Sequence, residues 1–278
     1  MSEATLDEVM AVLMARQVRD GDFIAHGASV PLAAAALMLA KELHAPNADF
    51  FYQGTITTAE RDPAKLMLDI EGIYRSAPAF FGQAQIVDFE LRGGGDFQFL
   101  RPAQIDRFGN VNTSLVGTLE RPRYRFHGIA VADAMTIVDR VCLYVTEHTQ
   151  RVFAEKLAYI TGLGHPGGDA WRRDLDVPGG GPSVVVTPLA ILDFDGPDRT
   201  MRLREVMAGV TVADVVANTG FELALADDVV EVLPPTHQEL TTLRRLDPLA
   251  TRRLEFREWR DEARARLAAE RPIDGSVG

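Results

Sequence analysis

The sequence contains a single cysteine, relatively few basic residues and no long hydrophobic segment. Because Cys142 is the only cysteine among 278 residues, an intrachain disulfide and a cysteine-rich metal site are both excluded. The 29 basic residues are outnumbered by 40 acidic ones, which gives a net charge of -11. Such a chain lacks the extended positive surface that displaces counterions from nucleic acid, so we expect no nucleic-acid partner. An anionic small molecule would need a local cluster of basic residues.

Hydrophobic residues form no run long enough to cross a bilayer. The longest run extends from Val30 to Ala40, well below the ~20 residues that a transmembrane helix needs. The first four residues, MSEA, are polar and acidic, and no basic stretch followed by an apolar core begins the chain. We therefore expect a cytoplasmic protein without a membrane partner.

Common cofactor-binding and metal-binding motifs are also missing. The six histidines lack the H-x-x-x-H spacing of a zinc site, so no metal is expected. Neither a P-loop nor a Rossmann glycine motif occurs in the sequence.

The first 55 residues alternate between helix and strand signals. Thr5 and Glu8 form a capping box ahead of apolar residues at helical spacing, and Ser29 with Pro31 opens a second helix. This alternation predicts a largely parallel sheet in an α/β fold. The expected helices and strands are residues 6–14, 23–27, 31–44 and 48–52.

Ligands of open parallel sheets bind beyond the carboxyl ends of the strands. Gly27 and the pair Gln53-Gly54 both follow predicted strands directly. The sequence therefore predicts a ligand site that includes both positions.

The remainder of the chain is predicted to be richer in strands. Glycines 93–95 indicate a turn, and residues 162–181, with seven glycines and two prolines, are expected to form a linker or mobile loop. Thr211 and Thr236 are predicted N-caps, the first of a helix closed by Gly220. The expected strands are residues 86–91, 97–100, 124–127, 140–145, 152–160 and 183–194, with a helix at 131–138.

The predicted organisation is one α/β domain followed by a short charged segment. Residues 1–248 are expected to form a mostly parallel open sheet flanked by helices, with an added strand-rich region. Residues 249–278 carry mixed Arg and Glu side chains and are expected to form a C-terminal helix, to about residue 270, and a tail.

Three stretches together resemble the class I coenzyme A (CoA) transferases. Residues 104–112, QIDRFGNVN, resemble the Q-D-x-x-G-N-x-N pattern of the family. Residues 126–133, FHGIAVAD, stand where the family has a Gly-Ser-Gly-Gly turn followed by Asp, and residues 183–236 resemble the tail of its subunits. The order and spacing of these stretches identify the chain as a member, with a likeness that covers most of residues 5–248. The resemblance implies the α/β CoA-transferase fold.

Within this family, the chain most resembles the beta subunits of actinobacterial enzymes that open a steroid ring (IpdAB type). The stretch RVCLYVTEHTQRVF at residues 140–153 contributes to this likeness. The resemblance implies an alpha–beta heterodimer or heterotetramer, with the active site between subunits. It implies hydrolytic opening of a carbon ring in a CoA thioester during late sterol ring-C/D catabolism. No cofactor is expected, because CoA is part of the substrate.

One position departs from the active subunits of the transferases. Tyr52-Gln53-Gly54-Thr55 stands where those subunits carry a Glu before the glycine. A carboxylate is the nucleophile that forms their covalent intermediates, and a neutral amide cannot replace it. The resemblance therefore implies that the catalytic Glu lies on the alpha subunit. Gln53 would orient water or a carbonyl through its amide; otherwise it is a loop residue bonded to backbone.

The other candidate catalytic residues lie in the stretch that replaces the Gly-Ser-Gly-Gly turn. Backbone N–H groups at Gly128 and Ala130 would stabilise an anion at the start of a helix, or form an ordinary strand-to-helix turn. His127 is either a general acid or base or a core histidine. The expected substrate-binding residues are Tyr52, Gly54 and Asn110.

Several polar residues have structural interpretations that we favour over catalytic ones. Asp106, Arg107, Asn110 and Asn112 are expected in a structural turn. Glu147 and His148 are adjacent in the sequence, so in an extended segment they would face opposite sides and could not pair; we expect them at a surface or interface. Glu60 and Glu71 are remote candidates for a carboxylate near Gln53.

Three other functions remain open on the sequence alone. The chain can be a subunit of a true CoA transferase whose Glu lies on the partner, or a scaffold subunit without a catalytic role. A sugar-phosphate isomerase or sensor of related fold is the third, but the sequence has no convergent phosphate loop.

Overall fold

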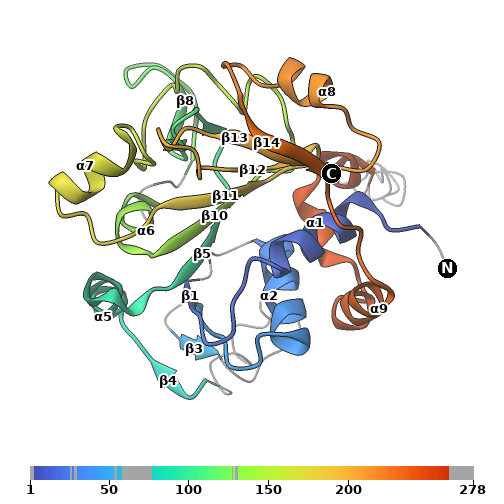
Figure 1. Cartoon of the computed structure of the whole chain (residues 1–278). Helices are drawn as coiled ribbons and strands as arrows, with labels where there is room; N and C mark the ends of the chain where they lie inside the picture. The colour runs from blue at the N-terminus through green and yellow to red at the C-terminus, as the bar shows by residue number, and fades with distance from the viewer. Residues whose placement is uncertain are drawn as a thin grey trace, which may run out of the picture.

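A ten-stranded sheet runs through the molecule in the order β14-β13-β12-β11-β10-β5-β1-β2-β3-β4 (Figure 1). The computed structural model describes residues 3–25, 27, 30–52, 55–57, 77–126, 128 and 131–262. The strands are β1 (Phe23–Ala25), β2 (Asp49–Tyr52), β3 (Thr55–Thr57), β4 (Ala79–Phe80), β5 (Phe97–Leu100), β10 (Arg140–Tyr144), β11 (Pro182–Val186), β12 (Ala190–Asp193), β13 (Arg202–Val206) and β14 (Ala224–Glu231).

The centre of the sheet is parallel and its flanks are mostly antiparallel. Strands β11, β10, β5, β1 and β2 all run in one direction. The pairs β2–β3, β3–β4, β11–β12 and β12–β13 are antiparallel, whereas β13–β14 is parallel. Two short ribbons follow β5 in the chain: β6 (Gln104–Ile105) with β7 (Val111–Asn112), and β8 (Leu115–Gly117) with β9 (Pro122–Arg125). The predicted sheet and strand-rich region are thus both present.

Helices cover both faces of the sheet. Figure 1 shows α1 (Leu6–Ala15), α2 (Pro31–Leu43) and α9 (His237–Leu246) on one side, and α6 (Val131–Ile137) and α7 (Gly168–Asp174) on the other. Other helices in the described residues include α5 (Gln83–Phe89), the π turn Glu90–Gly94, α8 (Val212–Ala217) and the 3-10 helix η2 (Thr251–Glu255). No helix in the described ranges is long and apolar enough to cross a membrane.

The buried apolar side chains form two clusters, one on each face of the sheet. Along β10, Cys142 and Tyr144 belong to the cluster beneath α1 and α2, whereas Val141 and Leu143 belong to the cluster beneath α6. Successive side chains of a strand point to opposite faces, so a strand buried on both sides must be apolar throughout. This explains the continuous apolar sequence of β10 at residues 141–144.

The strand order reverses between β1 and β5. The chain passes from β1 through α2 to β2 on one side, whereas β5, β10 and β11 follow one another on the other side. A crevice for ligands forms where the direction of winding changes, beyond the carboxyl ends of the two strands. In this chain, that place lies next to Gly27 and Arg101.

The C-terminal segment is tied to α1 by a network of buried charges. Arg252, 4% exposed, lies 2.8 Å from Asp7 and 2.9 Å from Asp247. Arg244 donates two hydrogen bonds to Glu8, and this contact lowers the Glu8 pKa to about 2. Residues 251–255 therefore pack on the main fold; the predicted domain boundary at residue 248 stays a prediction.

Most of the predicted elements are confirmed, but two predicted strands are wrong. Thr5, Thr211 and Thr236 are the N-caps of α1, α8 and α9 as expected, each within a capping box, although α8 has its C-cap at Asn218 and not beside Gly220. The N-cap of α2 is Val30, and Ser29 lies outside the described residues. Residues 86–91 belong to α5 and the π turn, and residues 152–160 form no strand, only an isolated bridge at Phe153. The predicted strand 183–194 is the hairpin β11–β12.

The expected mobile loop at residues 162–181 is instead an ordered crossover that contains α7. Arg172, only 8% exposed, donates hydrogen bonds to the carbonyl oxygens of Met135, Gly164 and Gly179. The burial lowers the Arg172 pKa to about 10. Glycines are frequent here because backbone passes close to backbone: a Cβ on Gly179 would approach the carbonyl of Thr136 to 2.6 Å.

Candidate active site

The candidate site lies at the carboxyl edge of the sheet, around the ends of β1, β2 and β5. Gly27 follows β1, Arg101 follows β5, and α2 begins at the same edge. Tyr52 ends β2, although only its backbone is described. The predicted site residues Gln53, Gly54, His127 and Ala130 lie outside the described residues, so their roles stay predictions.

Gly128 is held tightly against Thr113. The Thr113 hydroxyl donates a hydrogen bond of 3.0 Å to the Gly128 carbonyl oxygen. A Cβ built on Gly128 would overlap the carbonyl of Thr113 and lie 2.8 Å from its Oγ1. Only glycine fits at this position, so the backbone of residue 113 fixes where the turn before α6 begins.

Hydroxyl groups connect this turn to the residues after β7. Thr161 Oγ1 accepts a hydrogen bond of 3.0 Å from the Thr113 N–H and lies 2.7 Å from Ser114 Oγ. Asn112, fully buried, donates to Gln104 Oε1 and to the Leu115 carbonyl. Residues 104–112, QIDRFGNVN, therefore lead directly into Thr113, the residue that contacts the Gly128 turn.

Asn110 lies in a closed network of buried polar groups. Its Nδ2 donates to Asp106 Oδ2 at 2.9 Å, and its Oδ1 accepts from the Gly164 N–H at 2.9 Å. Burial raises the Asp106 pKa, while hydrogen bonds from Asn110 and Phe108 oppose the rise. This arrangement agrees with the structural turn expected for the stretch. A substrate-binding role for Asn110 stays a prediction, and it would require the amide to exchange partners.

An ion pair that no sequence motif predicts lies at the carboxyl end of β5. Arg101 Nη1 is 2.7 Å from Oε2 of Glu255, which is 3% exposed. The other oxygen of Glu255 accepts a hydrogen bond of 2.8 Å from the Leu32 N–H, and the Tyr144 hydroxyl lies 3.1 Å from Oε2. Burial raises the Glu255 pKa, and Arg101 opposes that rise. The only signal in the sequence is an arginine directly after an apolar strand.

Glu147 and His148 do not form a dyad, and the predicted surface position is wrong for His148. Glu147 pairs with Arg151 at 2.6 Å, whereas His148 is 5% exposed and stacks on Phe153. Its ring nitrogens lie 2.9 Å from Thr187 Oγ1 and 3.1 Å from Thr219 Oγ1. His148 is therefore a core histidine with both nitrogens engaged.

Burial of His148 predicts a loss of stability in acid. Burial lowers the His148 pKa from 6.5 to about 4 in the folded protein. The contribution of neutral His148 to the free energy of unfolding is therefore complete above pH 6.5 and is lost as the pH falls to about 4. The loss amounts to about 3 kcal/mol. Urea unfolding across this pH range should show a shallower decline for His148→Gln than for the wild type. Parallel profiles would show that His148 does not titrate as described.

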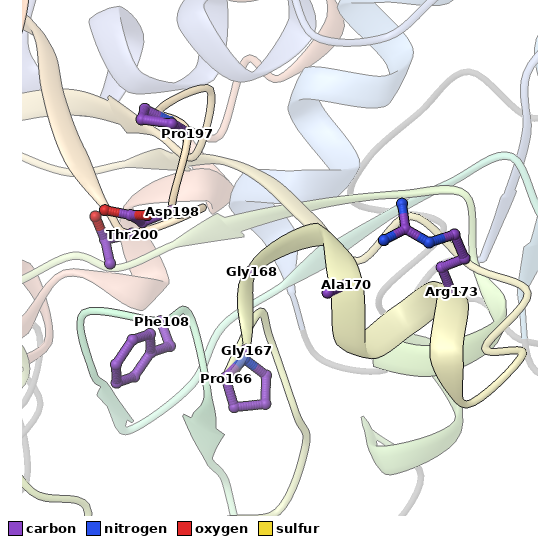
Figure 2. A pocket seen from close by; sticks show the side chains of 9 residues that line it. All are labelled: Phe108, Pro166, Gly167, Gly168, Ala170, Arg173, Pro197, Asp198 and Thr200. Atoms are coloured by element: carbon purple, nitrogen blue, oxygen red, sulfur yellow. The ribbon is translucent and has the colours of Figure 1, made fainter.

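A surface cavity of about 480 Å³ lies elsewhere, between the 106–110 turn and α7 (Figure 2). Phe108, Pro166, Arg173 and Asp198 contribute to its walls. None of its lining residues belongs to the segments that end β1, β2 or β5. Within the described residues, no group of three His, Cys, Asp or Glu side chains is arranged to hold a metal ion.

The described part of the site offers hydrogen-bond donors and one partly exposed cation. A backbone turn fixed by Thr113 precedes a helix, and a guanidinium stands between the ends of β1 and β10. Such groups can stabilise negative charge that develops on an oxygen atom. Among the described residues that form this part of the site, the only carboxylate is that of Glu255, which is buried and paired with Arg101.

Most of the chain is similar in sequence to coenzyme A transferases. The family profile described as Coenzyme A transferase matches residues 8–218. A 3-oxoadipate CoA-transferase subunit of Pseudomonas knackmussii is 31% identical over 248 residues, covering 89% of this chain and 95% of that protein. The cholesterol ring-cleaving hydrolase IpdB subunit of Rhodococcus jostii is 36% identical over 206 residues, covering 69% and 79% respectively.

A solved structure shares the fold. The crystal structure of Rhodococcus jostii IpdAB matches with a TM-score of 0.76 and 27% identity, over 92% of this chain and 99% of the matched chain. The fold predicted from the sequence is confirmed by this match.

Proposed function

Because this chain belongs to the coenzyme A transferase family, we propose that it is the beta subunit of a heteromeric hydrolase that opens a carbon ring in a CoA thioester. The partner is an alpha subunit, in a heterodimer or heterotetramer, and the pathway is late sterol ring-C/D catabolism. Support comes from the similarity to a subunit of the cholesterol ring-cleaving hydrolase and to the IpdAB structure.

The observation that carries this proposal is the amide at Gln53. A transferase of this family needs a carboxylate nucleophile, and this chain has a glutamine where its active subunits carry that Glu. A hydrolase needs only a base to activate water, and the partner's Glu supplies it. Gln53 then orients the water or the carbonyl that it attacks.

The proposed reaction is a retro-Claisen cleavage. Water, losing a proton to the base, adds to a ring ketone placed beta to the thioester carbonyl. The ring C–C bond then breaks, and its electron pair forms the enolate of the thioester. The enolate takes up a proton, and the former ketone becomes a carboxylate. Two successive oxyanions develop in this sequence, so fixed donors lower the barrier.

This chain contributes the donors and a cationic surface. The turn at Gly128, together with Ala130 and His127, is proposed to contact a developing oxyanion. The CoA phosphates need positive charge, and the β8–β9 hairpin carries the exposed side chains of Arg121, Arg123 and Arg125. No carboxylate pairs with these three arginines among the described residues. This local basic cluster stands out in a chain whose net charge is -11.

The proposal is tested by co-expression with an alpha subunit of the same family. CoA thioesters of cyclic beta-keto acids are incubated with the assembled enzyme, with and without an acceptor acid, and followed by mass spectrometry. We expect a gain of one water without transfer of CoA to the acceptor. Transfer of CoA to the acceptor, without ring opening, would contradict the proposal.

A true CoA transferase is the second candidate. The similarity to the 3-oxoadipate CoA-transferase subunit covers more of this chain, 89%, than the similarity to the IpdB subunit, 69%. In that case the partner's Glu is the nucleophile, and a covalent glutamyl thioester forms on the partner.

A further inference from the structure

Two consecutive residues, Thr113 and Ser114, hold the segment that carries the Gly128 turn at two points. The Thr113 hydroxyl donates a hydrogen bond of 3.0 Å to the Gly128 carbonyl oxygen. The Ser114 carbonyl oxygen accepts a hydrogen bond of 2.8 Å from the Phe126 N–H. The backbone at residues 113 and 114 therefore sets the position of the turn, because any shift of these two residues carries both contacts with it.

A single hydroxyl group contacts both of these residues. Thr161 Oγ1 accepts a hydrogen bond of 3.0 Å from the Thr113 N–H and lies 2.7 Å from Ser114 Oγ. A hydroxyl group has one donor and two acceptor lone pairs, so it can serve both neighbours at once. Thr161 lies 47 residues beyond Ser114 in the chain, so the fold and not the local sequence makes this contact.

The segment around Thr161 is itself held between β7 and α6. The Thr161 N–H donates to the Val111 carbonyl oxygen at 2.8 Å, and the Gly162 carbonyl oxygen accepts from the Val111 N–H at 2.9 Å. On the other side, a Cβ built on Gly162 would lie 2.7 Å from Cγ of Met135, a fully buried residue of α6. Both contacts fix the backbone that carries the Thr161 hydroxyl.

Loss of this hydroxyl would release the backbone beneath the turn. Thr113 is 9% exposed, and within the described residues its N–H has no hydrogen-bond partner besides Thr161 Oγ1. A buried N–H without a partner is costly, so the chain would shift to satisfy it. Displacement of reacting groups by about 1 Å is sufficient to lower a rate on the order of 100-fold.

We propose that Thr161 is a positioning residue, whose hydroxyl fixes Thr113 and Ser114 and thereby holds the Gly128 turn against the developing oxyanion. The inference rests on the proposed function, because it assigns a further residue to the same reaction. Thr161 acts through these neighbours and not through the substrate. Its loss therefore weakens stabilisation of the transition state and leaves substrate binding unchanged.

The test replaces Thr161 by valine, which keeps the branched shape and removes the hydroxyl. In the assembled enzyme, Thr161→Val is expected to lower kcat for opening of a cyclic beta-keto CoA thioester about 10–100-fold, with KM changed less than about twofold. Thr161→Ser keeps the hydroxyl and should restore most of the lost kcat. Ser114→Ala removes one of the two contacts of the hydroxyl and should lower kcat by a smaller factor.

Thr219→Val serves as the matched control. Thr219 is 5% exposed, and its hydroxyl donates to the Val215 carbonyl oxygen and contacts His148, so this hydroxyl is buried and bonded but does not contact residues 113, 114 or 128. The variant should lose thermal stability and keep the wild-type kcat.

Size-exclusion chromatography and thermal unfolding check that each variant assembles and folds; if Thr161→Val does not assemble, Ser114→Ala decides. An unchanged kcat in the assembled variants, or no recovery with Thr161→Ser, overturns the inference alone. Absence of ring opening by the wild type overturns the proposed function as well.

Discussion

Replacement of Gly128 by alanine is expected to lower the turnover number of the assembled enzyme about 100-fold. A Cβ at this position would overlap the Thr113 carbonyl and lie 2.8 Å from its Oγ1, so the turn must move away from its present place. Donors displaced by about 1 Å from a developing oxyanion lose most of their effect on the barrier. Steady-state kinetics on ring-opening substrates measure the loss.

The matched control is Gly196→Ala, because no atom lies within 4 Å of a Cβ built there. This variant should retain wild-type turnover. Size-exclusion chromatography and thermal unfolding then show whether Gly128→Ala still folds and assembles. An assembled Gly128→Ala enzyme with normal turnover would mean that the turn does not take part in the reaction.

The purified chain alone is expected to have essentially no activity. Its sequence has Gln53 where a carboxylate is required. Loss of a general base lowers the rate of a reaction by about 10²–10⁴-fold. Co-expression with the alpha-like partner should restore turnover. In the assembled enzyme, Gln53→Ala should cost far less than removal of the partner's Glu, because the glutamine only orients its neighbours.

Two controls complete this comparison. The separately purified partner should be inactive as well, and mixing the two chains should restore the rate. Full turnover by the single chain would contradict the assignment of the base to the partner. If Gln53→Ala and Gly128→Ala both assemble and keep the full rate, this chain is a scaffold without a catalytic role.

The sequence predicts local structure well wherever the signal is local. The capping boxes at Thr5 and Thr236 and the apolar strand at residues 140–144 depend on neighbouring residues, and all are confirmed. The strand predicted at residues 86–91 is wrong because a short apolar segment fits helix and strand equally. The positive φ of +84° at Gly93 interrupts the helical geometry inside the π turn.

In the candidate site as well, a local motif predicts some residues, whereas others are brought together only by the fold. A motif points to Gly128, and the structure supplies the reason that it is glycine: the Thr113 backbone lies against it. No motif points to Arg101 or Glu255, which are 154 residues apart in the chain. Only the packing of the C-terminal segment against α2 and β10 brings them together. Likewise, the glycine-rich crossover at residues 162–181 has the composition of a loop, although Arg172 is buried within it.

The decisive experiment traces the source of the oxygen in the ring-opened product. The assembled enzyme would open a cyclic beta-keto CoA thioester in water labelled with oxygen-18, and tandem mass spectrometry would locate the label. We expect one labelled oxygen in the new carboxylate, with CoA still attached to the other acyl group. An unopened ring with CoA exchanged onto an added acid, and a glutamyl thioester on the partner, would contradict it.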